Sequence, residues 1–307
     1  TNALDIAAKA EALAEKLYGR QSMEYSAIMD KKAGLYQMKG DFGSALQFEV
    51  NAVKALPEQG YASSDNQKFR LIYMNNTAQI QFSAKQYDQA AAVFEDICPE
   101  AKQVFGRFHP DYAMIMRNSA MANCALGKYE TAYSSIKESN YALLANMEKV
   151  FPYLSETEKV KFKNMITGNH DLFITIADKM QSKEKTDVSD DVFNFIRDTR
   201  GIIFRSNTQL RRQISSSRDS LLKVDFSRWL EIKKVIAKAI SNEGVADKNA
   251  LNLDSLNLLA NNLEKSISEK SSIFKNALEM KKLASGSIRS KFTRDECSVI
   301  TIRYKDL

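Results

Sequence analysis

Most of the chain carries apolar residues at helical spacing, and three stretches share one further pattern. In each stretch a small residue is followed by a glycine or lysine, then by an aromatic residue, and then by an alanine twelve positions after the first. A pair of helices joined by a tight turn explains this spacing, because small residues let helices approach closely and glycine suits the turn. We therefore predict three helix hairpins, built around Ala33, Gly40, Phe42 and Ala45; around Ala78, Lys85, Tyr87 and Ala90; and around Ala120, Gly127, Tyr129 and Ala132.

The hairpins also repeat over a longer distance. Tyr18–Tyr36 (YGRQSMEYSAIMDKKAGLY) matches Phe105–Asn123 (FGRFHPDYAMIMRNSAMAN) at an offset of 87 residues, and the middle unit divides this offset into steps of 45 and 42. Self-similarity at such a period indicates a stack of like units, so the N-terminal part is predicted to be a helical solenoid. Lys85 replaces the turn glycine in the middle unit, so that turn is expected to be strained or closed differently.

This pattern resembles the tetratricopeptide repeat, in the long form of about 42 residues that is typical of kinesin-light-chain-like proteins. The likeness is strong in His109–Tyr133, which reads HPDYAMIMRNSAMANCALGKYETAY. The resemblance implies an all-α fold, with a right-handed solenoid over residues 1–182. Asn2–Leu17 then corresponds to the second half of a truncated repeat. A fourth hairpin is expected to start at Ser155, where SETE forms a capping box.

A different helical pattern follows a short polar stretch after residue 182. Apolar positions at mostly helical spacing cover residues 189–241. The sequence leaves open whether this helix is interrupted around Ser206 and residues 215–217. A second helix is predicted over residues 254–283. Residues 183–290 are therefore expected to form a long antiparallel helical hairpin.

The last segment is predicted to be a strand. Cys297–Tyr304 is β-branched and alternating, and a strand needs a sheet, so residues 291–307 are expected to begin a truncated β-containing domain. The order of repeats, long helices and strand resembles bacterial TPR–CHAT proteins, which carry a caspase-like peptidase after their helices. Arg294–Tyr304 (RDECSVITIRY) resembles the first strand of that peptidase. The catalytic His and Cys of the family have no counterpart in this chain.

The residues that could carry catalysis are few and isolated. Cys98, Cys124 and Cys297 show no CxxC or CxxH spacing, which argues against a disulfide framework and a structural zinc site. Cys98 lies before a proline that is interpreted as a helix end. His109 opens a repeat and His170 lies in a predicted helix without a motif, so both are interpreted as structural. With no nucleotide-binding or metalloprotease motif, we predict a non-catalytic protein without cofactor or metal site.

Binding is the better-supported hypothesis, because stacked hairpins present an extended concave surface lined by the first helix of each hairpin. An asparagine amide can satisfy both the N–H and the C=O of an extended peptide, and lysine or arginine adds charge-assisted contacts to an acidic or C-terminal group. An alternative remains that these asparagines bond neighbouring helices, and the groove could also hold a segment of the same protein. Counting back from the small alanines, the predicted peptide-binding residues are Lys31, Asn75, Asn76, Gln79, Arg117, Asn118 and Met121.

Positive charge is concentrated in the C-terminal part of the chain. The net charge is +6, and residues 183–307 contain 24 Lys and Arg against 17 Asp and Glu. Nucleic acid is disfavoured as a partner, because few aromatic residues are available for base stacking and acidic residues are frequent. Docking onto an acidic domain of the same chain is preferred. No run of 18 apolar residues occurs, so no membrane partner is expected, and the free cysteines fit a cytoplasmic location.

We therefore expect a scaffold for protein–protein or peptide recognition. Its partners are a protein or peptide in the concave groove and the C-terminal peptidase domain of the same chain. In this interpretation the chain is part of a longer protein and forms the regulatory sensor region of a CHAT-type cysteine peptidase. The alternative is a free-standing adaptor or peptide-responsive regulator without a peptidase.

Overall fold

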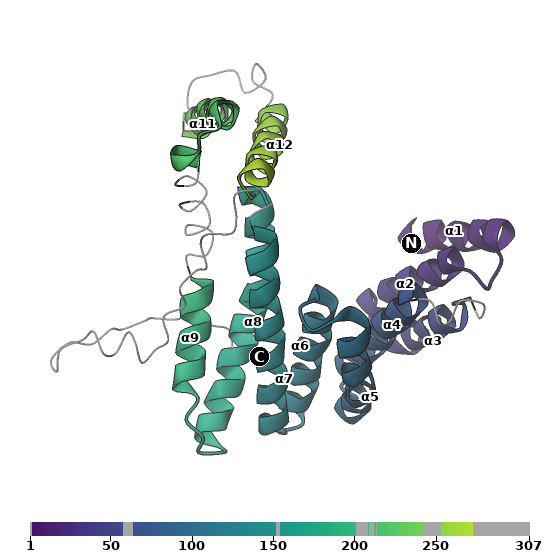
Figure 1. Ribbon diagram of the computed structural model, residues 1–307. Helices are drawn as coiled ribbons and strands as arrows, with labels where there is room; N and C mark the ends of the chain where they lie inside the picture. The colour runs from purple at the N-terminus through teal and green to yellow at the C-terminus, as the bar shows by residue number, and fades with distance from the viewer. Residues whose placement is uncertain are drawn as a thin grey trace. The chain divides into compact units, whose positions relative to one another are not determined.

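The described part of the chain is helical. The computed structural model describes residues 2–57, 64–151, 154–200, 214–241 and 253–272, together with residues 208 and 212, and these residues contain no strand. The expected all-α class is therefore confirmed for them. The helices, drawn in Figure 1, are α1 (Asn2–Tyr18), α2 (Met23–Met38), α3 (Phe42–Lys54), α4 (Ser64–Ser83), α5 (Tyr87–Phe105), α6 (Pro110–Ala125), α7 (Tyr129–Val150), α8 (Glu156–Ser182), α9 (Ser189–Thr199), α11 (Ser220–Ser241) and α12 (Leu253–Ser272).

Contacts divide these helices into two compact units, which are described separately. The first unit holds residues up to Leu143 together with 172–188, and the second holds 144–171 and the described residues from Ser189 onward. Helices α7 and α8 each contribute to both units. The domain boundaries expected after residues 182 and 290 stay predictions. The predicted strand lies outside the described residues.

In the first unit, helices that follow one another along the chain pack against one another. Each of the helices from α1 to α5 contacts the next one, and Figure 1 shows α1 to α6 as successive members of one array. The small residues of the repeated pattern lie where these helices meet, and none of the six has more than 1% of its surface exposed. A larger side chain at such a position would force the helices apart, which explains why the sequence keeps alanine there: Ala33, Ala45, Ala78, Ala90, Ala120 and Ala132.

The three turns of the repeated pattern close in the same way. Gly40 and Gly127 have φ angles of +78° and +72°, and Lys85 has +62°. In each turn the N–H of the next residue bonds the carbonyl oxygen five positions back, at 2.9–3.0 Å. This is the hydrogen-bond pattern that ends a helix on a left-handed residue. The middle turn is thus closed like the others, with a lysine in the region that favours glycine.

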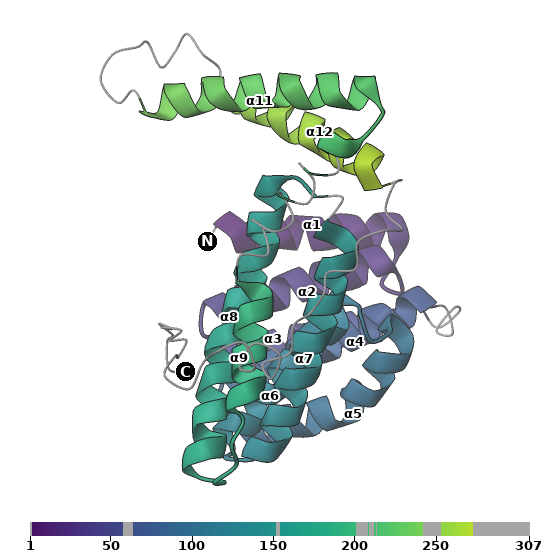
Figure 2. The ribbon, with the colours of Figure 1, turned by 60° about the vertical axis from the view of Figure 1, so that its left-hand side comes forward.

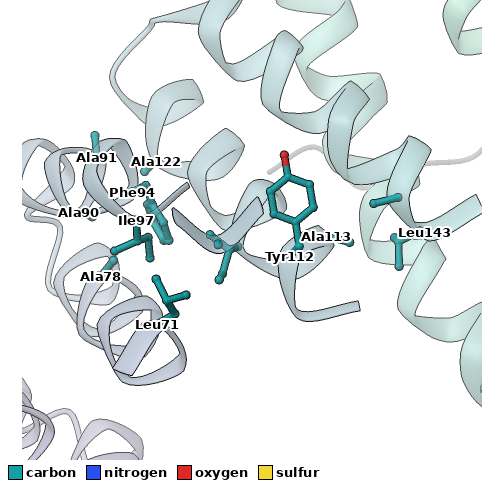
Figure 3. Packing of buried hydrophobic residues seen from close by; sticks show 13 residues of the cluster. Leu71, Ala78, Ala90, Ala91, Phe94, Ile97, Tyr112, Ala113, Ala122 and Leu143 are labelled. Atoms are coloured by element: carbon teal, nitrogen blue, oxygen red, sulfur yellow. The ribbon is translucent and has the colours of Figure 1, made fainter. Parts of the chain in front are cut away.

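Apolar side chains from α4, α5 and α6 form a core between the second and third hairpins of the repeated pattern. Figure 3 shows Leu71 and Ala78 of α4 close to Phe94 and Ile97 of α5, and all four are buried. Tyr112 of α6 belongs to the same cluster. Burying a phenylalanine or isoleucine stabilises a fold by about 1.5–3 kcal/mol, so this contact accounts for the close pairing of α4 with α5.

The proline of α5 does not end its helix. The sequence interpretation places a helix end at Cys98, but α5 continues through Pro99 to Phe105. Proline lacks an N–H, so the helix gives up one hydrogen bond there. Ile97 and Ala101, on either side of the proline, are buried in the core. We attribute the continuation of the helix to this packing.

The second unit contains the predicted capping box at the start of α8. The N–H of Ser155 donates to the Glu158 carboxylate at 2.9 Å, and the N–H of Glu158 donates to the Ser155 hydroxyl at 3.3 Å. This reciprocal pair confirms the predicted helix start. Phe162, which stands where the repeated pattern would have alanine, packs edge-on against Phe151 at 5.6 Å between ring centroids.

Helices α11 and α12 lie along each other in the second unit, as Figure 2 shows. They run antiparallel, because Lys270 near the end of α12 bonds Asp225 near the start of α11 at 2.7 Å. Trp229 is buried in their shared core and stacks on Phe226. The break that the sequence left open near residues 215–217 is found at residues 217–219, which are not helical and precede α11.

Candidate functional site

The predicted peptide-binding residues lie on α2, α4 and α6, which are alternate helices of the first unit. Side-chain contacts join three of these residues at the α2 end. Lys31 pairs with Asp30 at 2.9 Å, and Asp30 accepts a hydrogen bond from the Asn76 amide at 2.8 Å. The Asn75 amide in turn donates to the Asn76 oxygen at 3.3 Å. Helices α2 and α4 are therefore tied by polar side chains.

The same chain of contacts continues from α4 to α6. The Asn118 amide donates to the Asn75 oxygen at 2.9 Å, and Nη1 of Arg117 donates to the Asn118 oxygen at 3.4 Å. Nη1 of Arg117 also lies 3.3 Å from the sulfur of Met121. We call the connected side chains the asparagine network: Asp30, Asn75, Asn76, Arg117 and Asn118. Gln79, the remaining predicted residue, lies one turn along α4 and joins no hydrogen bond of this network.

Burial separates the asparagines into two groups. Asn75 has no exposed surface and Asn118 is 7% exposed, so both are buried. Asn76, Gln79, Arg117 and Met121 are half-buried, whereas Lys31 is exposed. The bond between Asn75 and Asn118 is the helix-to-helix contact that the sequence left open as an alternative. Peptide contact by the seven residues stays a prediction, and the partly exposed members are those that a ligand can reach.

Glu49 of α3 is a polar residue that the sequence analysis missed. It is only 1% exposed, and its Oε1 has no hydrogen-bond partner among the described residues. Burial, and to a lesser extent the nearby Asp30, raise the pKa of its carboxyl group to about 8, although a hydrogen bond from Asn76 and the charge of Lys31 oppose the rise. At neutral pH this carboxyl group is therefore mostly protonated.

A signal for Glu49 does exist in the sequence. Ala45 and Ala52, four residues before and three residues after it, are both fully buried. Residues at these spacings share one face of a helix. An acidic side chain between two buried alanines of one face is thus expected to point into the core, and it requires polar neighbours there.

Arg117 stands apart from the other arginines of the first unit. Arg70 and Arg107 bond the carboxylates of Glu100 and Glu138. The guanidinium of Arg117 contacts only Asn118 and Met121 among the described residues, and burial lowers its pKa. A cation that is partly removed from water without a carboxylate nearby is poised to bind an anionic group.

Cys98, His109 and His170 have the following surroundings in the structure. Burial raises the pKa of the Cys98 thiol to about 11, which suppresses the reactive thiolate. His109 caps α6 by accepting a hydrogen bond from the N–H of Asp111, and its ring stacks on Phe105. His170 contacts the hydroxyl of Thr199 at 2.6 Å.

Two further properties of the described residues bear on the sequence predictions. They contain no group of three or more His, Cys, Asp or Glu side chains that is arranged to hold a metal ion. None of their helices has the length and apolar character needed to span a bilayer.

Comparison with known proteins adds no relative. The chain matches no model of a protein family, and no curated protein matches it.

Proposed function

We propose that the chain is a tetratricopeptide-repeat solenoid that recognises an extended peptide segment of a partner protein. The proposal is supported by three like turns, six buried alanines at the hairpin contacts, and an asparagine network on the alternate helices α2, α4 and α6. In this arrangement those helices line a groove. The single observation that carries the proposal is the half-buried guanidinium of Arg117, which has no carboxylate partner among the described residues.

The members of the network have different roles in this proposal. The Asn118 amide donates to the Asn75 oxygen, and this buried bond holds α4 and α6 in register. Asn76 is partly exposed, and its oxygen, which accepts one hydrogen bond from Asn75, offers a second acceptor position to an N–H of the ligand backbone. Arg117 supplies charge-assisted hydrogen bonds to a carboxylate of the ligand, either an acidic side chain or a free C-terminus. The chain binds its ligand without transforming it.

The larger setting of this activity is also a proposal. By its resemblance to TPR–CHAT proteins, the chain is the regulatory sensor region of a caspase-like peptidase, and a peptide in the groove changes how the peptidase is held. The alternative is a free-standing adaptor without a peptidase. The sequence encoded after Leu307 distinguishes the two, because a His and a Cys in caspase-like contexts support only the first.

Selection of peptides from a random library by the 307-residue protein tests the binding proposal. Selected peptides are expected to share an acidic residue or a free carboxyl end. Arg117→Gln should weaken their binding about tenfold or more, since a hydrogen bond to a charged group contributes about 1.5–3 kcal/mol. Titration calorimetry measures the loss, and Arg212→Gln, which removes an exposed arginine outside the network, serves as the matched control. Unchanged affinity after Arg117→Gln would contradict the proposal.

A further inference from the structure

A buried carboxyl group lies where α2, α3 and α4 pack together. Glu49 belongs to α3, is 1% exposed, and has no hydrogen-bond partner for its Oε1 among the described residues. Of the described helices, α2 and α4 pack most closely against α3. The titratable groups that face Glu49 from these two helices are the acid Asp30, the cation Lys31 and the phenol Tyr73. The carboxyl group is thus enclosed by residues of three helices.

Asn76 links this carboxyl group to the proposed groove. Its amide nitrogen donates to Asp30 at 2.8 Å and also bonds Glu49. An asparagine amide has two N–H groups, so both are used between the two acids. The Asn76 oxygen accepts a hydrogen bond from Asn75 and is the atom that the proposed function assigns to the ligand. The orientation of that oxygen therefore depends on both carboxyl groups.

The stability of this arrangement depends on the charge of Glu49. When Glu49 is protonated, the negative charge of Asp30 is balanced by Lys31, 2.9 Å away. Loss of the proton places two negative charges beside one lysine, whose side chain is 78% exposed and therefore screened by water. A buried carboxylate with an unpaired oxygen is costly, and admitting water between the helices relieves that cost. Ionisation of Glu49 therefore loosens the contact of α2 with α4 and releases Asn76.

We propose that Glu49 is a proton switch for the groove. The peptide binds the form in which Glu49 carries a proton and α2 stays in contact with α4, and deprotonation of Glu49 weakens binding. This inference rests on the proposed function, because it concerns the regulation of the same surface. Linkage requires that a ligand that prefers the protonated form takes up protons as it binds.

The affinity of a selected peptide at two pH values tests this proposal. The peptide is acetylated at its N-terminus and contains no His or Cys, so that it does not titrate between pH 6.5 and pH 8.5. Burial, together with Asp30, raises the pKa of Glu49 to about 8, which leaves about a quarter of the molecules protonated at pH 8.5. The dissociation constant should therefore rise about fourfold from pH 6.5 to pH 8.5. Calorimetry at pH 8.5 in two buffers of different ionisation enthalpy should show proton uptake on binding.

Three variants of the 307-residue protein assign the effect to Glu49. Glu49→Gln cannot ionise, so its affinity should be the same at both pH values and its binding should take up no proton. Glu95→Gln, at an exposed position of α5, is the matched control and should keep the wild-type response. Lys31→Gln removes the charge that opposes the rise in the pKa of Glu49, so the loss of affinity should move to higher pH. Because Lys31 is exposed, this variant leaves the core intact and provides the test if Glu49→Gln does not fold.

The outcomes at pH 6.5 separate the proton switch from the proposed function. If no peptide binds even at pH 6.5, both the proposed function and the switch are overturned. If peptides bind at pH 6.5 with the same affinity as at pH 8.5 and without proton uptake, the switch alone is overturned. Proton release on binding, a wild-type response in Glu49→Gln, or an unchanged pH midpoint in Lys31→Gln would overturn the switch as well.

Discussion

At the scale of single residues, the asparagine network brings together groups that are costly to bury alone. Asp30 receives the Asn76 amide on one oxygen and Lys31 on the other. Glu49 approaches the same site from α3 and is mostly protonated at neutral pH, which avoids placing a second full negative charge beside Asp30. The contact between α2 and α4 therefore depends on the protonation state of one buried carboxyl group.

The stability of the protein should fall as Glu49 ionises. Its pKa is about 8 in the folded protein and 4.5 in an exposed chain, so the stabilisation is complete below pH 4.5 and is lost as the pH rises through 8. Glu49→Gln keeps a polar group of similar size and cannot ionise. The free energy of unfolding should therefore depend less on pH in the variant, with a difference on the order of a few kcal/mol between pH 5 and pH 8.5.

Urea unfolding followed by circular dichroism at both pH values measures this effect. Glu95→Gln, at an exposed position of α5, is the matched control and should follow the wild-type profile. If Glu49→Gln and the wild-type protein lost stability equally between the two pH values, the ionisation of Glu49 would make no contribution to the pH dependence of the free energy of unfolding.

The sequence predicts which residues share the site but not how each side chain is used. The positions of Asn75, Asn76 and Asn118 follow from counting along the repeats. Asn75 and Asn76 are neighbours in sequence, however, and a rotation of α4 by a fraction of a turn decides which of them is buried. Glu49 was not predicted because it belongs to the second helix of a hairpin, whereas the predicted groove is lined by the first helices.

At the scale of elements, the hairpins were predictable because steric contact depends on residue size. Alanines at twelve-residue spacing and a left-handed turn residue leave few other arrangements for two helices. The path of α5 through Pro99 was not predictable in this way, since the burial of Ile97 and Ala101 depends on α4 and α6. Local preference for a helix end is overridden there by tertiary packing.

Replacing Lys85 by glycine should stabilise the middle turn. Lys85 has a φ of +62°, a conformation that costs an L-residue about 1–2 kcal/mol, while glycine adopts it freely. We expect Lys85→Gly to raise the free energy of unfolding by about 1 kcal/mol, measured by urea denaturation.

The reverse change at an equivalent turn provides the control. Gly127 has a φ of +72° and an added Cβ would meet only the Tyr129 hydroxyl, at 4.0 Å, so Gly127→Ala tests backbone strain without a clash. It should destabilise the protein by a similar amount. A loss of stability in Lys85→Gly would mean that the lysine side chain contributes more than its backbone costs.

At the scale of the whole molecule, alternate helices of the first unit place polar side chains on a common network, while these helices and the helices between them both contribute to the apolar core. The shared polar network is the physical basis for proposing recognition on α2, α4 and α6. The predicted C-terminal strand and its sheet lie outside the described residues and take no part in this argument.

Hydrogen exchange with and without a selected peptide tests the central claim most directly. A peptide bound along the asparagine network should slow amide exchange in residues 23–38, 64–83 and 110–125, because contact with the ligand suppresses local opening of these helices. Residues 42–54 and 87–105, in the helices between them, should change much less. Protection confined to α3 and α5, or no protection in α4 and α6 at a saturating concentration of peptide, would contradict the account.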